Sequence, residues 1–267
     1  MPELPEVETI TRNLRPALLG RQVVSVGLFW PRTLATPAAE RFAEQISGQR
    51  IEQVTRRAKY IHITLSGGHL LIHLRMSGDL FMRPSPYAAQ PHDRLHLMLD
   101  SGETLVFNDT RKFGRVWLVD QPDEVLGKLG PEPFSVEFSS ASLHTALQSH
   151  HRQLKPLLLD QSFVAGLGNI YSDEALHLSG LHPLRQSDTI SYEEAGKLFD
   201  AIRAVLQTGI DNNGASIDWV YRGGSFQNHF RVYGRTGEAC LVCNTPIQRI
   251  VVGQRSTHFC PGCQLRA

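Results

Sequence analysis

The sequence predicts an α+β protein with two domains: an N-terminal helix and a set of strands, then a helical region that ends in a small cysteine module. Three observations favour this organisation. Short runs with period-two alternation fill most of residues 22–120, helical periodicity follows from about 139 to 208, and all four cysteines fall in the last 28 residues. The chain has 267 residues, of which 41% are hydrophobic, so it is long enough for two domains with buried cores.

The first expected element is a helix at residues 5–18. Its apolar stripe at helical spacing consists of Val7, Ile10, Leu14 and Leu18. Gly20 stands just beyond it, where a C-terminal cap is expected. Acids and proline are favourable in a first helical turn, which explains Pro5 and the glutamates beside it. Helix formation does not explain Pro2, which directly follows Met1.

The next region consists of short alternating runs separated by turns that contain Gly and Ser, which predicts a β-sandwich or a small barrel. The expected strands are residues 23–30, 60–65, 69–76, 94–100, 103–109 and 114–119. The sequence "GPEPFS" at residues 130–135 indicates a linker. We therefore expect the N-terminal domain to occupy residues 1–130.

Helical periodicity returns after the linker. The expected helices are residues 139–149, 155–161, 169–178 and 191–208. Short strands are expected at 230–234 and 247–253, around the cysteines. These patterns predict a helical domain at residues 131–225 and an appended module at residues 230–264.

The four cysteines carry the strongest local signal in the chain. Cys240, Cys243, Cys260 and Cys263 have the spacing C-x2-C, sixteen residues, C-x2-C. Each pair can present two thiolates to one tetrahedral ion, so the spacing predicts a single structural Zn²⁺. Disulfides are the alternative, but an acidic rather than a basic-then-apolar start disfavours secretion.

The sixteen residues between the cysteine pairs predict a hairpin that turns near Gly253. Arg255 then lies close to the tip, where a guanidinium on a rigid hairpin can hold a phosphate. Two glycines precede the helix expected to open near Asn169, and the free N–H groups of a helix N-terminus bind anions. An ordinary exposed arginine and a plain N-cap are the alternatives. The glycines do not follow a strand, which disfavours a dinucleotide-binding fold.

Charge is distributed unevenly, although the net charge is only +1. Residues 221–267 contain six arginines and one acid, residues 50–59 are basic, and the first nine residues contain three acids and no base. Local basic zones with an acidic start indicate a polyanionic partner and a separate acidic reaction centre, whereas a solvated charged face is the alternative for each cluster. No apolar run approaches the length of a membrane span, so we expect a cytoplasmic protein without a membrane partner.

Five motifs occur together in order: "PELPEVET" (2–9), "HLRMSG" (73–78), "FNDTRKFGR" (107–115), "GLGNIY" (166–171) and "QRSTHFCPGCQ" (254–264). With these motifs and the zinc spacing, the whole chain resembles the formamidopyrimidine-DNA glycosylase family, whose sister family is endonuclease VIII. The resemblance implies an N-terminal helix with a β-sandwich, a helix–two-turn–helix domain and a zinc hairpin. It further implies a monomeric bacterial enzyme of base excision repair that acts on damaged double-stranded DNA without a nucleotide cofactor.

The resemblance also accounts for Pro2. It implies that Met1 is removed and that the secondary amine of Pro2 is the nucleophile, which attacks the sugar C1′. An α-amino group has a pKa of about 7.7–8.0, so a useful fraction is unprotonated near neutral pH. The iminium formed by a secondary amine is an electron sink for the eliminations that cut the strand. Excision of oxidised purines, followed by β,δ-elimination, is the implied reaction.

The other roles follow from the resemblance position by position. Glu3 matches the general acid/base beside the nucleophile, Lys59 a lysine that contacts a phosphate and aids β-elimination, and Arg255 an arginine that assists δ-elimination. Supporting residues of the active site are Glu6, Lys155 and Asn169. Contacts with the DNA backbone are expected from His73, His92 and Arg152.

An enzyme that acts on a stacked base must flip it out, and side chains then fill the gap. Met76, Arg111 and Phe113 match the three inserted residues of the family, and packing within a β-hairpin is the alternative for the two apolar ones. The arginine and phenylalanine favour the formamidopyrimidine family over endonuclease VIII. The segment 220–234 looks shorter than the loop that closes over the flipped base in many members. Two alternatives remain: an endonuclease VIII-like enzyme for oxidised pyrimidines, and a zinc protein that binds damaged DNA without cutting it.

Overall fold

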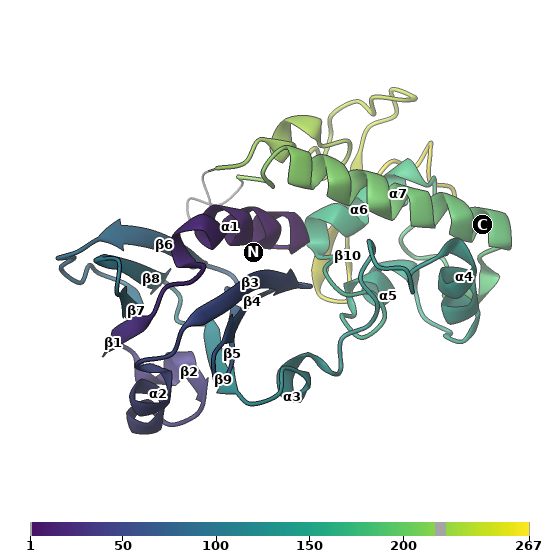
Figure 1. Ribbon diagram of the computed structural model, residues 1–267. Coiled ribbons are helices and arrows are strands. Elements are labelled where there is room, and N and C mark those ends of the chain that lie inside the picture. Colours follow the sequence, from purple (N-terminus) through teal and green to yellow (C-terminus); the bar gives the residue numbers. More distant parts are fainter. Residues whose placement is uncertain (1, 217–222, 267) are drawn as a thin grey trace. The chain divides into compact units, whose positions relative to one another are not determined.

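The structure is a computed structural model that describes residues 2–216 and 223–266. The chain divides into two compact units, Met1–Lys128 with Ser216–Gly223 and Leu129–Ala215 with Gly224–Ala267. Figure 1 shows the first unit as strands with a helix at the N-terminus and the second as mostly helices. Met1 and the first three residues of the segment 220–234 lie outside the described residues. Among the described residues, no helix is long and apolar enough to cross a membrane.

The first unit contains two sheets, which confirms the predicted helix-plus-sandwich organisation. One sheet has the order β1 (Val23–Leu28), β7 (Asp93–Leu99), β8 (Glu103–Asp109) and β6 (Gly78–Pro84). The other has the order β2 (Leu34–Thr36), β9 (Arg115–Val119), β5 (Gly68–His73), β4 (Tyr60–Leu65) and β3 (Ile51–Arg57). Apolar residues of both sheets share one core with helix α1 (Leu4–Leu18). The described part of the unit also contains two short α-helices, α2 (Ala39–Ile46) and α3 (Asp123–Leu126), and a 3-10 helix at Pro31–Thr33.

Helix α1 begins and ends where local chemistry dictates. Glu3 is the N-cap and Glu6 the N3 residue of a capping box, so each carboxylate accepts a backbone N–H of the other. Leu19 is the C-cap, and Gly20 follows at φ +78°, a left-handed conformation that ends the helix without a Cβ clash. The stripe that was predicted from the sequence is buried.

The second unit is built from α4 (Ser140–Gln148), α5 (Leu154–Leu159), α6 (Asn169–Leu178), α7 (Tyr192–Asp211) and the hairpin of β10 (Gln248–Val252) and β11 (Arg255–Phe259). Helix α6 packs against α5, α7 and β11. The hairpin turns at Gly253 and Gln254, both at positive φ, as the sequence predicts. The expected linker at 130–135 packs on this unit, since Ala165 N–H donates to the Pro131 carbonyl at 3.0 Å.

The prediction of a strand at 230–234 is wrong. The carboxylate of Glu174 accepts the N–H groups of Arg231, Val232 and Tyr233 at 2.8–3.0 Å. These backbone donors are therefore not available to hydrogen-bond a neighbouring strand. Burial raises the pKa of Glu174, although these three donors oppose the shift. Among the described residues, five α-helices and strands were missed: β2, β3, β6, α2 and α3.

Candidate functional site

The start of α1 places two carboxylates beside Pro2. Glu3 and Glu6 are 2% and 3% exposed, and Pro2 is buried with them. The Glu3 N–H donates to Glu6 Oε2 at 2.7 Å, which fixes the backbone that carries Pro2. Glu6 is a first-turn acid, as helix formation alone predicts, and it also belongs to the capping box of α1.

Lys59 and His73 lie near one another at one end of the five-stranded sheet. Lys59 is 5% exposed in the tight turn between β3 and β4, where Ala58 has φ 53°. His73 ends β5, and its Nδ1 accepts the Arg75 N–H at 3.0 Å. Burial, reinforced by the charges of Arg75 and Lys59, lowers the pKa of His73 to about 3. His73 is therefore neutral near pH 7 and adds no positive charge to this end of the sheet.

The three candidate gap-filling residues lie on neighbouring loops of the four-stranded sheet. Met76 is 38% exposed in the turn before β6, and Phe113 is 48% exposed in the loop after β8. Arg111 is exposed on the same loop, and its guanidinium lies 5.0 Å from the centre of the Phe113 ring. His92, at φ 77°, is exposed in the turn before β7. The packing alternative for Met76 and Phe113 does not account for this exposure.

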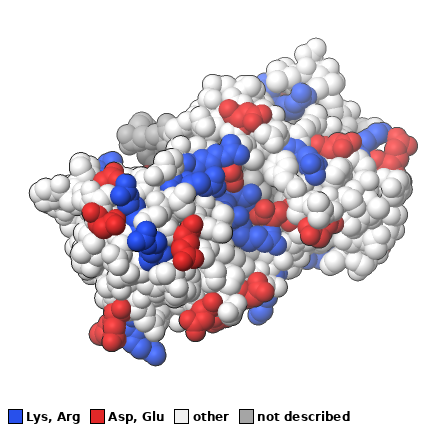
Figure 2. Space-filling view, in the orientation of Figure 1, with Lys and Arg blue, Asp and Glu red and all other residues white. Residues whose placement is uncertain are grey.

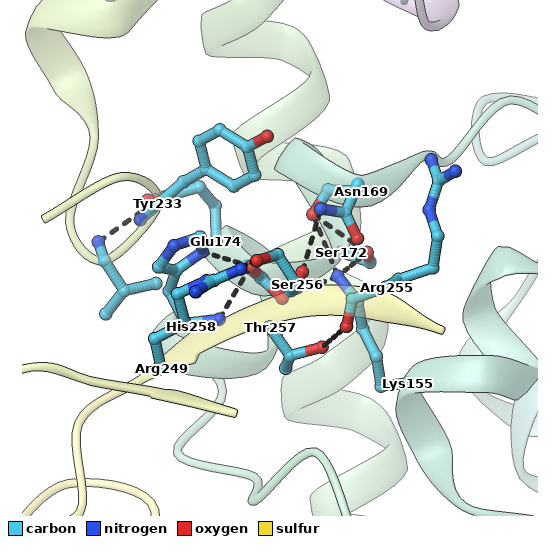
Figure 3. Close-up of polar contacts among 12 residues, drawn as sticks. Lys155, Asn169, Ser172, Glu174, Tyr233, Arg249, Arg255, Ser256, Thr257 and His258 are labelled. Carbon is cyan, nitrogen blue, oxygen red and sulfur yellow. Dashed lines mark hydrogen bonds and ion pairs between the residues drawn. The ribbon is translucent and has the colours of Figure 1, made fainter. Parts of the chain in front are cut away.

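In the second unit, helix α6 starts above a buried ion pair (Figure 3). The ammonium of Lys155 is fully buried and donates to Asp173 Oδ1 at 2.5 Å, to Ser172 Oγ at 2.7 Å and to the Asn169 carbonyl at 2.9 Å. Asp173 Oδ2 accepts the backbone N–H of His258 at 2.9 Å. Lys155 therefore supports the N-terminus of α6 from the buried side. Its side chain has no exposed surface that could contact a base.

Asn169 connects the start of α6 to the hairpin. The N-cap of α6 is Gly168, so the N-cap interpretation of Asn169 is wrong by one residue. Its Nδ2 instead donates to the Ser256 carbonyl at 2.9 Å, and its Oδ1 is buried without a hydrogen-bond partner among the described residues. Arg255 stands next to Ser256, and Figure 3 shows its side chain directed away from the buried network. This hydrogen bond ties the start of α6 to the strand that carries Arg255.

Arg152, the remaining candidate for a DNA contact, is exposed before α5. Its guanidinium pairs with Asp160 at 2.7 Å. Figure 2 shows both signs of charge on the face drawn, in agreement with the small net charge. Attraction of a polyanion must therefore come from local groups rather than from the field of the whole chain.

The four cysteines converge on one point. Their Sγ atoms all lie within 4.8 Å of one another, and three of the pairs are 3.4–3.8 Å apart. A tetrahedral ion with Zn–S bonds of about 2.3 Å places thiolates about 3.8 Å apart, so the donor set fits. The Cys240 sulfur also lies 3.5 Å from His177 Nε2. Burial, with the charges of Arg231 and Arg235, lowers the pKa of His177 to about 4.

Sequence reasoning missed the buried carboxylates that organise these groups. Asp173 and Glu174 lie in the middle of an ordinary helical pattern, and Asp109 ends a strand inside the quoted motif "FNDTRKFGR". The only signal in the sequence was that these acids stand at positions that periodicity predicts to be buried. A buried carboxylate requires a hydrogen-bond or ion-pair partner.

Comparisons with known proteins agree along the whole chain. Family models described as the formamidopyrimidine-DNA glycosylase N-terminal domain, the H2TH domain of the same glycosylase and a zinc finger found in FPG and IleRS match residues 1–116, 129–220 and 237–266. The four cysteines therefore form one structural zinc site.

Full-length relatives and solved structures agree with the family models. Formamidopyrimidine-DNA glycosylases of Chloroflexus aggregans and Chloroflexus aurantiacus are 48% and 46% identical, over 99% of this chain and 99% and 98% of theirs. A crystal structure of the Lactococcus lactis glycosylase bound to DNA with an AP site has a TM-score of 0.92 at 36% identity, over 99% of this chain and all of that one. A MutM complex with DNA containing carbocyclic 8-oxo-G has a TM-score of 0.92 at 37% identity, with the same coverage.

Proposed function

The chain belongs to the formamidopyrimidine-DNA glycosylase family and is a DNA glycosylase of base excision repair; from this premise we propose that it excises oxidised purines and is also an AP lyase that cuts the strand. The observation that carries the lyase proposal is the buried start of α1. Pro2 stands there beside Glu3, whose N–H is held by the Glu6 carboxylate at 2.7 Å.

The nucleophile is the amine of Pro2 after removal of Met1. Its lone pair attacks C1′, the bond from C1′ to the base breaks, and the base leaves with the proton that the Pro2 nitrogen loses once it is bonded to C1′. Glu3 donates a proton to the ring oxygen O4′ as the sugar opens, which leaves an iminium between Pro2 and C1′. Loss of a proton from C2′ then expels the 3′ phosphate, which is the β-elimination. Loss of a proton from C4′ expels the 5′ phosphate, which is the δ-elimination.

Three cations assist these steps. Lys59 holds a phosphate near the lesion and promotes the first elimination, and Arg255 holds a phosphate and promotes the second. Asn169 supports Arg255 through the Ser256 carbonyl, and Lys155 supports Asn169 from the buried side. Zinc is structural, since four thiolates leave no open position for a water molecule.

DNA containing the lesion is the proposed partner, as in the complexes of the similar structures. Met76, Arg111 and Phe113 fill the gap left by the flipped nucleotide, and His73, His92 and Arg152 contact the backbone. We place the enzyme with the bacterial chromosome, as a monomer that needs no nucleotide cofactor.

Excision from matched duplexes tests the proposal. Purified protein is incubated with duplexes containing 8-oxoguanine opposite cytosine or 5-hydroxyuracil opposite guanine, and products are resolved with and without alkali. Preferential cleavage at 8-oxoguanine without alkali supports the proposal. Preference for 5-hydroxyuracil would indicate an endonuclease VIII-like enzyme, and binding without cleavage would leave a damage-binding protein.

Two variants on α1 sharpen this test. E3Q keeps the size of the side chain but cannot donate the proton to O4′, so we expect strand cleavage without alkali to fall by at least about a hundredfold, the usual contribution of a general acid. E8Q, on the same helix, removes a carboxylate that pairs with Arg12 and Arg56 and serves as the matched control.

A further inference from the structure

A buried carboxylate lies between the loops that carry the gap-filling residues. Asp109 ends β8 directly opposite Gly78 and is 1% exposed. Its Oδ1 accepts the Ser77 hydroxyl at 2.5 Å and the Arg111 N–H at 3.2 Å, and its Oδ2 accepts the Gly114 N–H at 2.7 Å. One side chain therefore bonds both ends of the loop that presents Arg111.

Ser77 extends the same network to the other loop, since it follows Met76 in the chain. While its hydroxyl donates to Asp109, its oxygen accepts the Arg111 N–H at 3.1 Å. The two turns are thus joined by hydrogen bonds that converge on one carboxylate, with no contact between the exposed side chains required.

Both loops lie tightly on the ring of Phe107. A Cβ on Gly114 would lie 2.4 Å from that ring, and a Cβ on Gly78 would lie 2.9 Å from it. The loops therefore have little room to shift as long as the hydrogen bonds at Asp109 hold them down.

The backbone of Asp109 reaches a fourth candidate contact. Its N–H donates to the His92 carbonyl at 2.9 Å, and its carbonyl accepts Arg94 Nε at 2.7 Å. His92 and Lys112 both have positive φ, a conformation that persists only where the surroundings enforce it. Asp109 is the common point of these constraints.

We propose that Asp109 is a positioning residue of the glycosylase step: through its carboxylate it holds Met76, Arg111 and Phe113 in the joint arrangement that enters the gap left by the flipped nucleotide. The proposal rests on the proposed function. This role requires a hydrogen-bond acceptor at both carboxylate oxygens of Asp109, because three donors point at them. An asparagine there turns an NH2 toward at least one of these donors, which removes that hydrogen bond and sets two donors against each other.

The test compares D109N with D100N, the same substitution just after the far end of β7, where within residues 2–216 and 223–266 Asp100 accepts only the Gln22 N–H. Gap filling is followed by the fluorescence of 2-aminopurine stacked beside the lesion in a duplex. Cleavage is measured on an 8-oxoguanine duplex and on a single-stranded abasic oligonucleotide, which leaves no gap to fill. Thermal unfolding establishes that each variant is folded.

We expect D109N to lose the fluorescence change and about tenfold or more in duplex excision, while cleavage of the single strand stays within about twofold of wild type. D100N should match wild type in all three. In a chain that also carries M76A, R111A and F113A, D109N should cause little further loss, since it acts through those residues.

If D109N does not fold, S77A provides the same comparison, because it removes only the hydroxyl that bridges Asp109 and Arg111. Equal losses on both substrates, or wild-type excision by folded D109N, would overturn the positioning role. Failure of wild-type protein to excise 8-oxoguanine would instead reject the proposed function, so the two failures are distinguishable.

Discussion

Replacing Lys155 with methionine should be strongly destabilising for the second unit. Methionine fills a similar volume, but it leaves the Asp173 carboxylate fully buried beside Ser172 without its ammonium partner. Removing one member of a buried ion pair costs about 3–5 kcal/mol, because the remaining charge stays out of water. The second unit has about 130 residues, and at that size each kcal/mol lowers Tm by about 4 °C, which predicts a loss of about 12–20 °C.

Scanning calorimetry combined with zinc release into a chromophoric chelator measures this effect. Zinc release reports the second unit, because Asp173 holds β11 of the zinc hairpin through the His258 N–H. K197M is the matched control: Lys197 pairs with Glu193 at 2.8 Å on α7, but both side chains are exposed, so little change is expected.

The double variant K155M/D173N separates the charge from the packing. Removing both charges should recover part of the loss, because no unpaired ion is then buried. A K155M protein that melts and releases zinc as K197M does would refute the reasoning. A double variant that is no better than K155M would show that volume, rather than charge, matters at this position.

Three further outcomes are expected. Lowering the pH from 6.5 toward 3 should reduce the free energy of unfolding. The pKa of His73 is depressed in the folded protein, so over this range the unfolded chain binds a proton that the folded protein does not. In H73N, the urea midpoint should change less with pH over the same range. C243S, or a chelator, should release zinc and weaken DNA binding, while in a W219F background the fluorescence of Trp30 and Trp117, both in the first unit, stays unchanged. G78A should destabilise by about 1–3 kcal/mol in a denaturant titration, since its Cβ would lie 2.5 Å from a backbone oxygen, whereas G196A, in open space within α7, should stabilise by about 0.5–1 kcal/mol.

Local patterns predicted the elements that are held together locally. Helix α1 has its stripe and cap within twenty residues, and the zinc hairpin is marked by its cysteine spacing and by Gly253 at its turn. Strand β3 was missed because charged residues break its alternation, although it pairs with β4 along its length. The error at 230–234 has another cause: the hydrogen bonds that replace a strand there come from Glu174, which lies 57–59 residues away in the sequence.

The candidate site also contains residues that local motifs predict and residues that only the folded structure identifies. Residues proposed to meet DNA or the sugar were recognisable from their motifs, and their roles remain proposals to be tested. The residues that position them were not. Asp173 accepts a backbone N–H from 85 residues away, and Asp109 joins nearby backbone groups to the hydroxyl of Ser77, 32 residues away, and no spacing rule identifies such sets. The structure therefore adds the supporting carboxylates rather than the reactive groups.

Borohydride trapping tests the central claim most directly. Protein whose mass establishes that Met1 is absent is mixed with a duplex containing 8-oxoguanine opposite cytosine, treated with borohydride, digested and sequenced by mass spectrometry. The account predicts a covalent complex between the DNA and the nitrogen of Pro2. A complex mapped to a lysine, or no complex with either this duplex or an abasic one, would contradict it.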